Sequence, residues 1–239
     1  QSNFLLRNKR GNDRPPMIKF LNENDVSLLI KRAPSGENTK FLKNAHNLWF
    51  RFKNYDRYPC LALYKGEICV AVIYATFSDK TGYTNLYEIC TMQNMERKGY
   101  ASEIWSEYLK IAYERKMKRL KISCTPESIG WHKKNGLLFW GVDKQGSLKS
   151  DQPLKRTREE QIRFRDKAVI DPGIAKPDEK VCEKLKNEQI ENVKLNPKQG
   201  VRTWNAIKNV GDYYLGRYLW TTENYKIEKE GSSNGIIGL

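Results

Sequence analysis

The chain has 239 residues and a mass of 28.0 kDa, enough to bury a substantial core, which excludes a peptide-sized scaffold. Hydrophobic residues make up 39% and charged residues 30%, a balance typical of globular proteins and not of chains disordered throughout. The longest apolar run, residues 68–77, has about half the ~20 residues that a membrane-spanning helix needs, so we expect no membrane partner. A formal net charge of +15, spread along the chain, should attract polyanions, and we expect nucleic acid, DNA first, as the partner.

Cysteine and histidine usage argues against metal or disulfide chemistry. The five cysteines are odd in number and form no CxxC pair, which predicts buried free thiols in a reducing cytoplasm. His46 and His132 lie far apart and have no ligand cluster at metal-binding spacing, so we expect no metal. The start Gln1-Ser2-Asn3, without Met, is typical of what a cleaved purification tag leaves.

The first half of the chain alternates strand and helix signals. A short apolar strand over 17–21 is followed by a helix that begins near Asn24 and ends before Pro34. A second amphipathic helix is expected over 38–49. Strands are then expected over 60–64 and 67–77, joined by a tight turn, and over 83–92.

The next elements resemble the layout of a phosphate-binding site. A polar loop with one glycine, residues 93–99, leads into a helix with one apolar face over 101–112, and a strand over 119–124 follows. A strand linked to the next strand through a helix implies a parallel pair. A short helix over 127–135 and a strand over 137–142 complete a mixed sheet with helices on both faces.

The last part of the chain has a different composition. Residues 144–200 lose the strand signal and become highly charged, which predicts one exposed helix, supported by Glu159 and Arg163 at i,i+4, and a loop-rich stretch. Residues 201–225 are aromatic again, and 215–221 could add a late strand. We therefore divide the chain into five parts. They are a basic arm with a tag remnant (1–16), a core (17–143), a charged insertion (144–200), an aromatic segment packing on the core (201–230) and a flexible tail (231–239).

The glycine loop is the first candidate site. A helix N-terminus after such a loop offers outward-pointing backbone N–H groups and the positive end of the helix dipole, which together attract phosphate. Six residues occupy this position: Arg97, Lys98, Gly99, Tyr100, Ala101 and Ser102. The side chains of Ala101 and Ser102 are small and leave space beside the glycine.

At this point the chain resembles the GCN5-related N-acetyltransferase (GNAT) family. The family signature Gln/Arg-x-x-Gly-x-Gly/Ala aligns with residues 96–101, where Glu96 departs from it, and residues 87–92 look like the family's fourth strand. Residues 131–137 are similar to its aromatic-Tyr-x-Lys-x-Gly-Phe segment, with His132 in place of the Tyr. The resemblance covers about residues 17–142 and implies a mostly antiparallel mixed sheet with a splayed central parallel pair, followed here by a charged C-terminal extension.

The resemblance also implies roles for individual residues. Backbone N–H groups of residues 97–102 would hold the pyrophosphate of acetyl-CoA or another acyl-CoA, and Met92 or its neighbour would polarise the thioester carbonyl through a main-chain N–H. Glu88 would accept the proton of the attacking amine, and His132, Tyr108 or Tyr100 would serve the departing thiolate. A solvent-facing Glu88 and a surface His132 are the structural alternatives.

Three functions remain open from the sequence, two of them enzymatic and one non-catalytic. A basic insertion and late aromatic residues suit nucleic acid, with Arg156, Arg158 and Arg163 on phosphates and Trp204, Tyr213, Tyr214 and Trp220 stacking an unstacked base. The length, basicity and C-terminal region look like the phage Mom DNA-modification proteins, which derivatise the exocyclic amine of adenine; that would place the chain in the host cytoplasm. The alternatives are an N-acetyltransferase of a protein or aminoacyl-tRNA amine, and a non-catalytic GNAT-like module that binds nucleic acid. Oligomeric state cannot be inferred.

Overall fold

The computed structural model describes residues 16–32, 60–92, 94–143, 147–195 and 205–216, with side chains of α6 described up to residue 188. These residues divide into two compact units, which are described separately. The first comprises 1–74 with 88–104, and the second comprises 75–87 with 105–239. None of the described helices is long and apolar enough to span a bilayer.

One seven-stranded sheet has the order β1-β2-β3-β4-β5-β7-β6. Every assigned pairing is antiparallel except that of β4 with β5, which is parallel. The strands are β1 Met17–Phe20, β2 Cys60–Lys65, β3 Ile68–Ser78, β4 Tyr83–Thr91, β5 Arg119–Cys124, β6 Gly141–Val142 and β7 Leu148–Pro153. Helices flank this sheet, so the predicted mixed, mostly antiparallel fold with one central parallel pair is confirmed.

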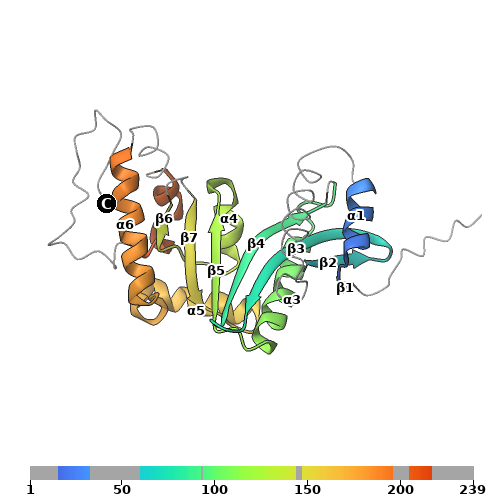
Figure 1. Ribbon diagram of the computed structural model, residues 1–239, viewed down its shortest axis with the longest axis horizontal. Coiled ribbons are helices and arrows are strands. Elements are labelled where there is room, and N and C mark those ends of the chain that lie inside the picture. The colour runs from blue at the N-terminus through green and yellow to red at the C-terminus, as the bar shows by residue number, and fades with distance from the viewer. Residues whose placement is uncertain (1–15, 33–59, 93, 144–146, 196–204, 217–239) are drawn as a thin grey trace, which may run out of the picture. The chain divides into compact units, whose positions relative to one another are not determined.

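In the first unit, α1 (Glu23–Arg32) packs on strands β1 and β2 (Figure 1). The apolar side of α1 meets alternate residues of the strands, so that Val26, Ala62 and Val72 share one cluster with Tyr74. Asn22 and Asp25 cap α1 reciprocally, because each accepts the other's backbone N–H. The helix predicted over 38–49 lies outside the described residues.

In the second unit, β5, β7 and β6 lie side by side with α6 (Glu179–Leu195) next to β6 (Figure 1). The second unit also contains α4 (Ile129–Lys134) and α5 (Arg158–Ile170), whereas α3 (Tyr100–Glu114) begins in the first unit and belongs to the second from Trp105 onward. Three short 3-10 turns occur in the second unit as well: η1 Pro126–Ser128 before α4, η2 Pro172–Ala175 between α5 and α6, and η3 Gly211–Tyr213 after α6. Leu138, Trp140 and Leu185 pack in one core cluster, so α6 completes the core over β6.

The charged insertion contradicts the prediction in two places. Residues 148–153 form β7, which pairs with β5 inside the sheet, and residues 179–195 form α6 where a loop-rich stretch was expected. β7 lacked an apolar signal because its buried positions Ser150 and Gln152 are polar. Their burial is stabilised by hydrogen bonds: the Gln152 amide donates to Gly136 O and accepts from Leu138 N, both at 2.8 Å.

Two smaller expectations were also wrong. The strand predicted over 137–142 is limited to Gly141–Val142, since Phe139 instead makes an isolated parallel bridge with Tyr214. α5 was expected to be exposed, but Gln161, Arg165 and Ala168 on one side of it are buried. The late strand at 215–221 lies almost wholly outside the described residues.

Gly136, at the end of α4, is tightly constrained. Its φ is +85°, and an added Cβ would come within 2.7 Å of the Gln161 backbone. We expect Gly136→Ala to lower the free energy of unfolding by about 2–4 kcal/mol, since strain at positive φ adds to overlap with an immovable backbone. Gly130→Ala is the control, because Gly130 lies within α4 with nothing within 4 Å of an added Cβ. Urea unfolding of both variants checks this, and equal stabilities would contradict it.

Candidate functional site

The loop between β4 and α3 adopts a backbone suited to binding an anion. Asn94, Arg97 and Gly99 all have positive φ, at 63°, 61° and 85°. We call residues 94–99 the nest, because left-handed residues in a loop can turn neighbouring N–H groups toward one side, where they bind negatively charged groups. An added Cβ at Gly99 would meet nothing within 4 Å, so the space beside the glycine is open.

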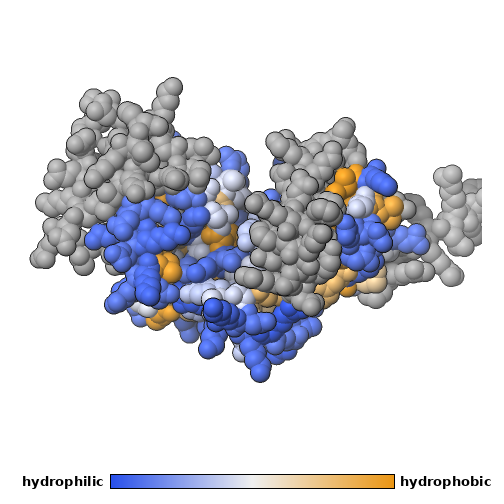
Figure 2. Space-filling model, in the orientation of Figure 1, coloured by the Kyte–Doolittle hydropathy of each residue, from blue (hydrophilic) through white to orange (hydrophobic). Residues whose placement is uncertain are grey.

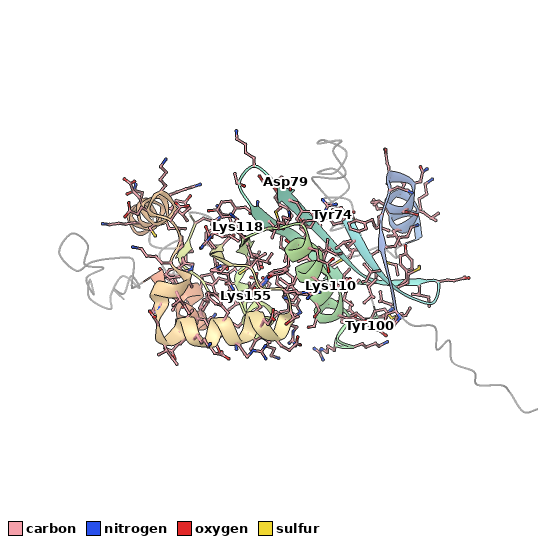
Figure 3. All side chains as sticks on the ribbon, turned by 90° about the horizontal axis from the view of Figure 1, so that it is seen from below. Tyr74, Asp79, Tyr100, Lys110, Lys118 and Lys155 are labelled. Atoms are coloured by element: carbon pink, nitrogen blue, oxygen red, sulfur yellow. The ribbon has the colours of Figure 1, made fainter. Side chains whose placement is uncertain are left out.

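α3 begins directly after this loop. The first N–H that bonds inside the helix is that of Glu103, which donates to Gly99 O at 3.0 Å, so Gly99 is the N-cap. The N–H groups before it point out of the N-terminal end of α3, where Tyr100 is labelled in Figure 3. The predicted position of residues 97–102 at a helix N-terminus is therefore present.

Lys65 brings a further cation to this end of α3, and sequence reasoning missed it. Its ammonium lies 2.9 Å from the Glu103 carboxylate and 5.5 Å from the centre of the Tyr100 ring. Lys65 is the last residue of β2, thirty-eight positions before Glu103, so no local pattern could have indicated the contact. Exposed Arg97 and Lys98 add two more cations, and they offset the exposed Glu96 in the same loop.

The resemblance implied that the N–H of Met92 or its neighbour polarises the thioester carbonyl, and the N–H of Met92 itself is already bonded. Its N–H donates to Val70 O at 2.9 Å, and this bond continues the pairing of β4 with β3. The N–H of Met92 is therefore committed to the sheet. Because successive N–H groups of a strand point to opposite edges, Thr91 N–H faces the edge away from β3.

On the other edge, β4 soon loses its parallel neighbour. β4 pairs with β5 only from Tyr83 to Leu86, opposite Arg119 to Ile122. Nevertheless β4 continues to Thr91 and β5 to Cys124. The assigned parallel pairing therefore ends at Leu86 and Ile122, and Glu88 lies in the part of β4 that follows it.

Glu88 is half-buried, and its environment favours the neutral acid. Its Oε2 atom is buried and has no hydrogen-bond partner among the described residues. Burial therefore raises the pKa of Glu88 from its usual 4.5 to about 7. A carboxyl group with this pKa can exchange a proton near neutral pH, which suits a general base.

His132 is buried in the second unit, where Trp131 contacts its ring edge-on at a centroid distance of 5.0 Å. Burial lowers the pKa of His132 to about 4, so the ring is neutral at neutral pH. Its Nδ1 atom has no partner within the described part of the chain. A neutral imidazole carries one N–H, so His132 could donate a hydrogen bond but could not deliver a proton as an imidazolium.

Tyr108 and Tyr214 are core residues, and both expectations for them were wrong. Tyr108 is fully buried, and its hydroxyl oxygen lies 2.5 Å from Thr84 Oγ1. The Thr84 hydroxyl donates its own hydrogen bond to Thr76 O. The Tyr108 hydroxyl must therefore donate to Thr84 and cannot serve a thiolate. Tyr214 is 2% exposed and its ring packs against Gly216, so it cannot stack a base at the surface.

The arginines expected on phosphates differ in their surroundings. Arg156 and Arg163 are exposed, and Arg156 pairs with Glu114 at 3.8 Å. Arg158 is half-buried and donates through Nε to Asn135 Oδ1 at 2.6 Å. Trp204 and Trp220 lie outside the described residues. Tyr213 is half-buried under two cations, Lys133 and Arg165.

Two pockets open on the second unit. The first lies between the sheet and α6. Its polar lining consists of Tyr87, the amide of Asn85 and the hydroxyls of Ser123 and Ser150, and its charged lining residues are Lys121, Lys149, Lys184, Asp151 and Glu188. The second lies beside α4 and α5, and it is lined by four cations and no carboxylate. Among the described residues, no group of His, Cys, Asp and Glu could hold a metal ion.

Comparison with known proteins gives the family of this domain. Residues 26–137 match the model of the acetyltransferase (GNAT) family. These residues form a GNAT acetyltransferase domain. Members of this family use acetyl-CoA, so the domain is an acyl-CoA acyltransferase, and the nest before α3 fits the phosphates of that donor. No curated protein matches the chain significantly in sequence.

Solved structures resemble the chain at low sequence identity. A Thermoplasma acidophilum N-acetyltransferase in complex with coenzyme A is 13% identical, with 59% of this chain and 99% of that chain covered and a TM-score of 0.48. A spermidine N-acetyltransferase variant from Vibrio cholerae is 8% identical, with 62% and 96% covered and a TM-score of 0.47. A ribosomal-protein alanine N-acetyltransferase from Escherichia coli is 14% identical, with 59% and 95% covered and a TM-score of 0.42.

The loop geometry predicts how acetyl-CoA binding responds to charge at Gly99. A carboxylate introduced by Gly99→Glu would face the donor's diphosphate, so the affinity for acetyl-CoA should fall at least about tenfold. Gly82→Glu is the matched control, since Gly82 also has positive φ, +69°, but lies in the turn before β4. Titration calorimetry measures both, and equal affinities in the two variants would contradict the assignment.

Proposed function

We propose that this acyltransferase acylates an amine carried by nucleic acid, and that the first acceptor to test is the exocyclic amine of adenine in DNA. The observation that carries the acceptor proposal is charge. The chain has a formal net charge of +15, and the pocket beside α4 and α5 is lined by four cations without a carboxylate. A small cationic amine would be repelled by such a surface, whereas a polyanion is attracted to it.

The described surface is consistent with a polar, charged partner. Figure 2 shows a mostly hydrophilic face over the described residues. The pocket under α6 adds groups that could contact a base: the aromatic Tyr87 is 48% exposed, and Asn85 and Ser123 supply donors and acceptors. A paired adenine directs its amine at its partner base, so the base must leave the stack to react.

The donor half of the reaction is assigned to the first unit. Acetyl-CoA, when bound, supplies an acyl group activated as a thioester. The nest of residues 94–99 and the N-terminus of α3 would hold its phosphates, with Lys65, Arg97 and Lys98 nearby as cations. Gly99 would allow the backbone to approach closely, because no side chain occupies that space.

Glu88 is proposed as the base. An exocyclic base amine is neutral at neutral pH and must lose a proton when its nitrogen forms a new bond. Glu88 can accept that proton because its pKa, about 7, lies close to the working pH. His132 remains the candidate donor of a hydrogen bond to the departing sulfur, and Tyr100 at the start of α3 is the other.

The pKa of Glu88 sets the expected pH dependence. The carboxylate is the active form, so kcat/KM should rise with pH through about 7 and level off above it. Glu88→Gln should remove this dependence and lower kcat/KM by about 10²–10⁴-fold. Glu107→Gln, which alters a carboxylate paired with Lys110 on α3, should behave as wild type. A lysine acceptor would instead give a rise toward pH ~10.

The acceptor is tested by mass spectrometry of nucleosides digested from plasmid DNA of cells that express the chain. A deoxyadenosine of increased mass, absent with Glu88→Gln and present with Glu107→Gln, is the expected result, and the mass difference identifies the acyl group. Unmodified DNA and RNA together with a folded chain that acylates a peptide or an aminoacyl-tRNA amine would refute the proposal.

A further inference from the structure

The pocket beside α4 and α5 is built from parts of the chain that follow the matched family segment as well as from α4. Lys133 and Lys134 come from the last turn of α4, Arg158 and Arg165 from α5, and Asn209 and Tyr213 from the segment around η3. All of them belong to the second unit. We propose that this pocket, which we call the α4–α5 basic pocket, binds a backbone phosphate of the nucleic acid.

The two arginines of the pocket are held in fixed positions by the C-terminal end of α4. Arg158 donates through Nε to Asn135 Oδ1 at 2.6 Å and through Nη2 to Lys134 O at 3.3 Å. Arg165 donates to Lys133 O through Nη1. These bonds add side-chain donors to the carbonyls at the C-terminal end of α4, where Lys133 O also accepts from Gly136 N–H at 3.1 Å. They hold both guanidinium planes in place before any ligand arrives. A site ordered in advance loses little entropy on binding.

The carboxylates near the pocket neutralise only part of its charge. Asp166 accepts from Nε and Nη2 of Arg165 at 2.9 and 2.7 Å, so this arginine is largely balanced. Glu159 lies 4.0 Å from Arg158, and its side chain is 66% exposed. Arg158 therefore keeps most of its charge toward the pocket, because an exposed contact at that distance is weak.

The two lysines supply the remaining positive charge. Lys133 donates to Asn209 O at 3.5 Å and lies over the Tyr213 ring at 4.6 Å, and neither contact carries a negative charge. The Lys134 side chain is exposed, and its ammonium group makes no hydrogen bond or ion pair with any described residue. Together with Arg158, these ammonium groups form a set of donors suited to phosphate oxygens.

We specify a phosphate of an extended polymer because the chain carries further exposed cations outside the pocket. Arg163 is exposed on α5, roughly 140° around the helix from Arg158, and Arg156 is exposed just before that helix begins. A polymer with many phosphates can contact such cations as well as the pocket, with each contact releasing counterions. This proposal rests on the proposed function, since it names the part of the surface that holds the acceptor.

Lys134→Ala tests the pocket, since Lys134 is exposed and the loss of its ammonium group removes no hydrogen bond or ion pair among the described residues. Fluorescence anisotropy of a labelled DNA duplex is measured with the full chain between about 50 and 200 mM salt. Lys134→Ala should weaken binding about five- to tenfold near 0.1 M salt and reduce the slope of log K against log salt by about 1. Lys134→Arg should restore both, because the charge is retained.

Lys110→Ala is the matched control, since Lys110 is a half-exposed lysine on α3 whose only partner in the described part is Glu107 (Figure 3). It should bind DNA as wild type does. If both alanine variants bind DNA equally weakly, or if Lys134→Ala binds it as wild type does, the proposed role of the pocket is overturned. The proposed function then still holds as long as the wild-type chain modifies DNA. A wild-type chain that neither binds nor modifies nucleic acid overturns both.

A second source of phosphate is the donor itself, and the same variants distinguish it. Acetyl-CoA affinity is measured by calorimetry for wild type and Lys134→Ala. We expect equal affinities, because the donor phosphates are assigned to the nest before α3. A loss of acetyl-CoA affinity with unchanged DNA binding would assign the pocket to the donor and overturn the proposal.

Discussion

The anchoring of β4 to β3 is the constraint on which the candidate site depends. The two strands are neighbours in the sheet, and the bond from Met92 N–H to Val70 O holds the residue that follows β4 against β3. Beyond Leu86, where the assigned parallel pairing ends, the chain successively provides a desolvated carboxyl group, a loop with left-handed residues and the N-terminus of α3. A strand held in this way places these groups in a fixed order along the chain.

Burial acts in opposite directions on the two titratable candidates. It raises the pKa of Glu88 to about 7 and lowers that of His132 to about 4, because in each case the charged form is penalised. The consequence is a division of roles. Glu88 can take up a proton near neutral pH, whereas His132 stays neutral and can contribute only a hydrogen bond.

Local patterns were sufficient to predict the part of the fold that bears the donor site. The apolar runs of β3 and β4, the glycine loop and the amphipathic α3 are each encoded within a few residues, so periodicity and turn signals located them. The glycine loop and the helix pattern placed residues 97–102 at the N-terminus of this helix, and the structure has Gly99 as its N-cap.

The features that the sequence did not predict share a physical cause: each depends on contacts with residues that are distant in the sequence. β7 buries Gln152 because its amide bonds to Gly136 and Leu138, which no hydrophobic pattern reveals. Lys65 reaches α3 through an ion pair across the sequence, and Tyr108 was misjudged because its hydroxyl is already committed to Thr84. The residue type predicted which hydrogen bonds and ion pairs these side chains are able to form. Only the packing in the structure shows which of these groups already have a partner.

The central claim is that a desolvated Glu88 serves as the base at neutral pH. The most direct test is a pH titration of the full chain by NMR with side-chain carboxyl ¹³C-labelled glutamate, where Glu88→Gln identifies the signal. The account predicts a midpoint near 7 for Glu88. A midpoint near the ordinary value of 4.5 would contradict it, since the carboxylate would then be too weak a base for this role.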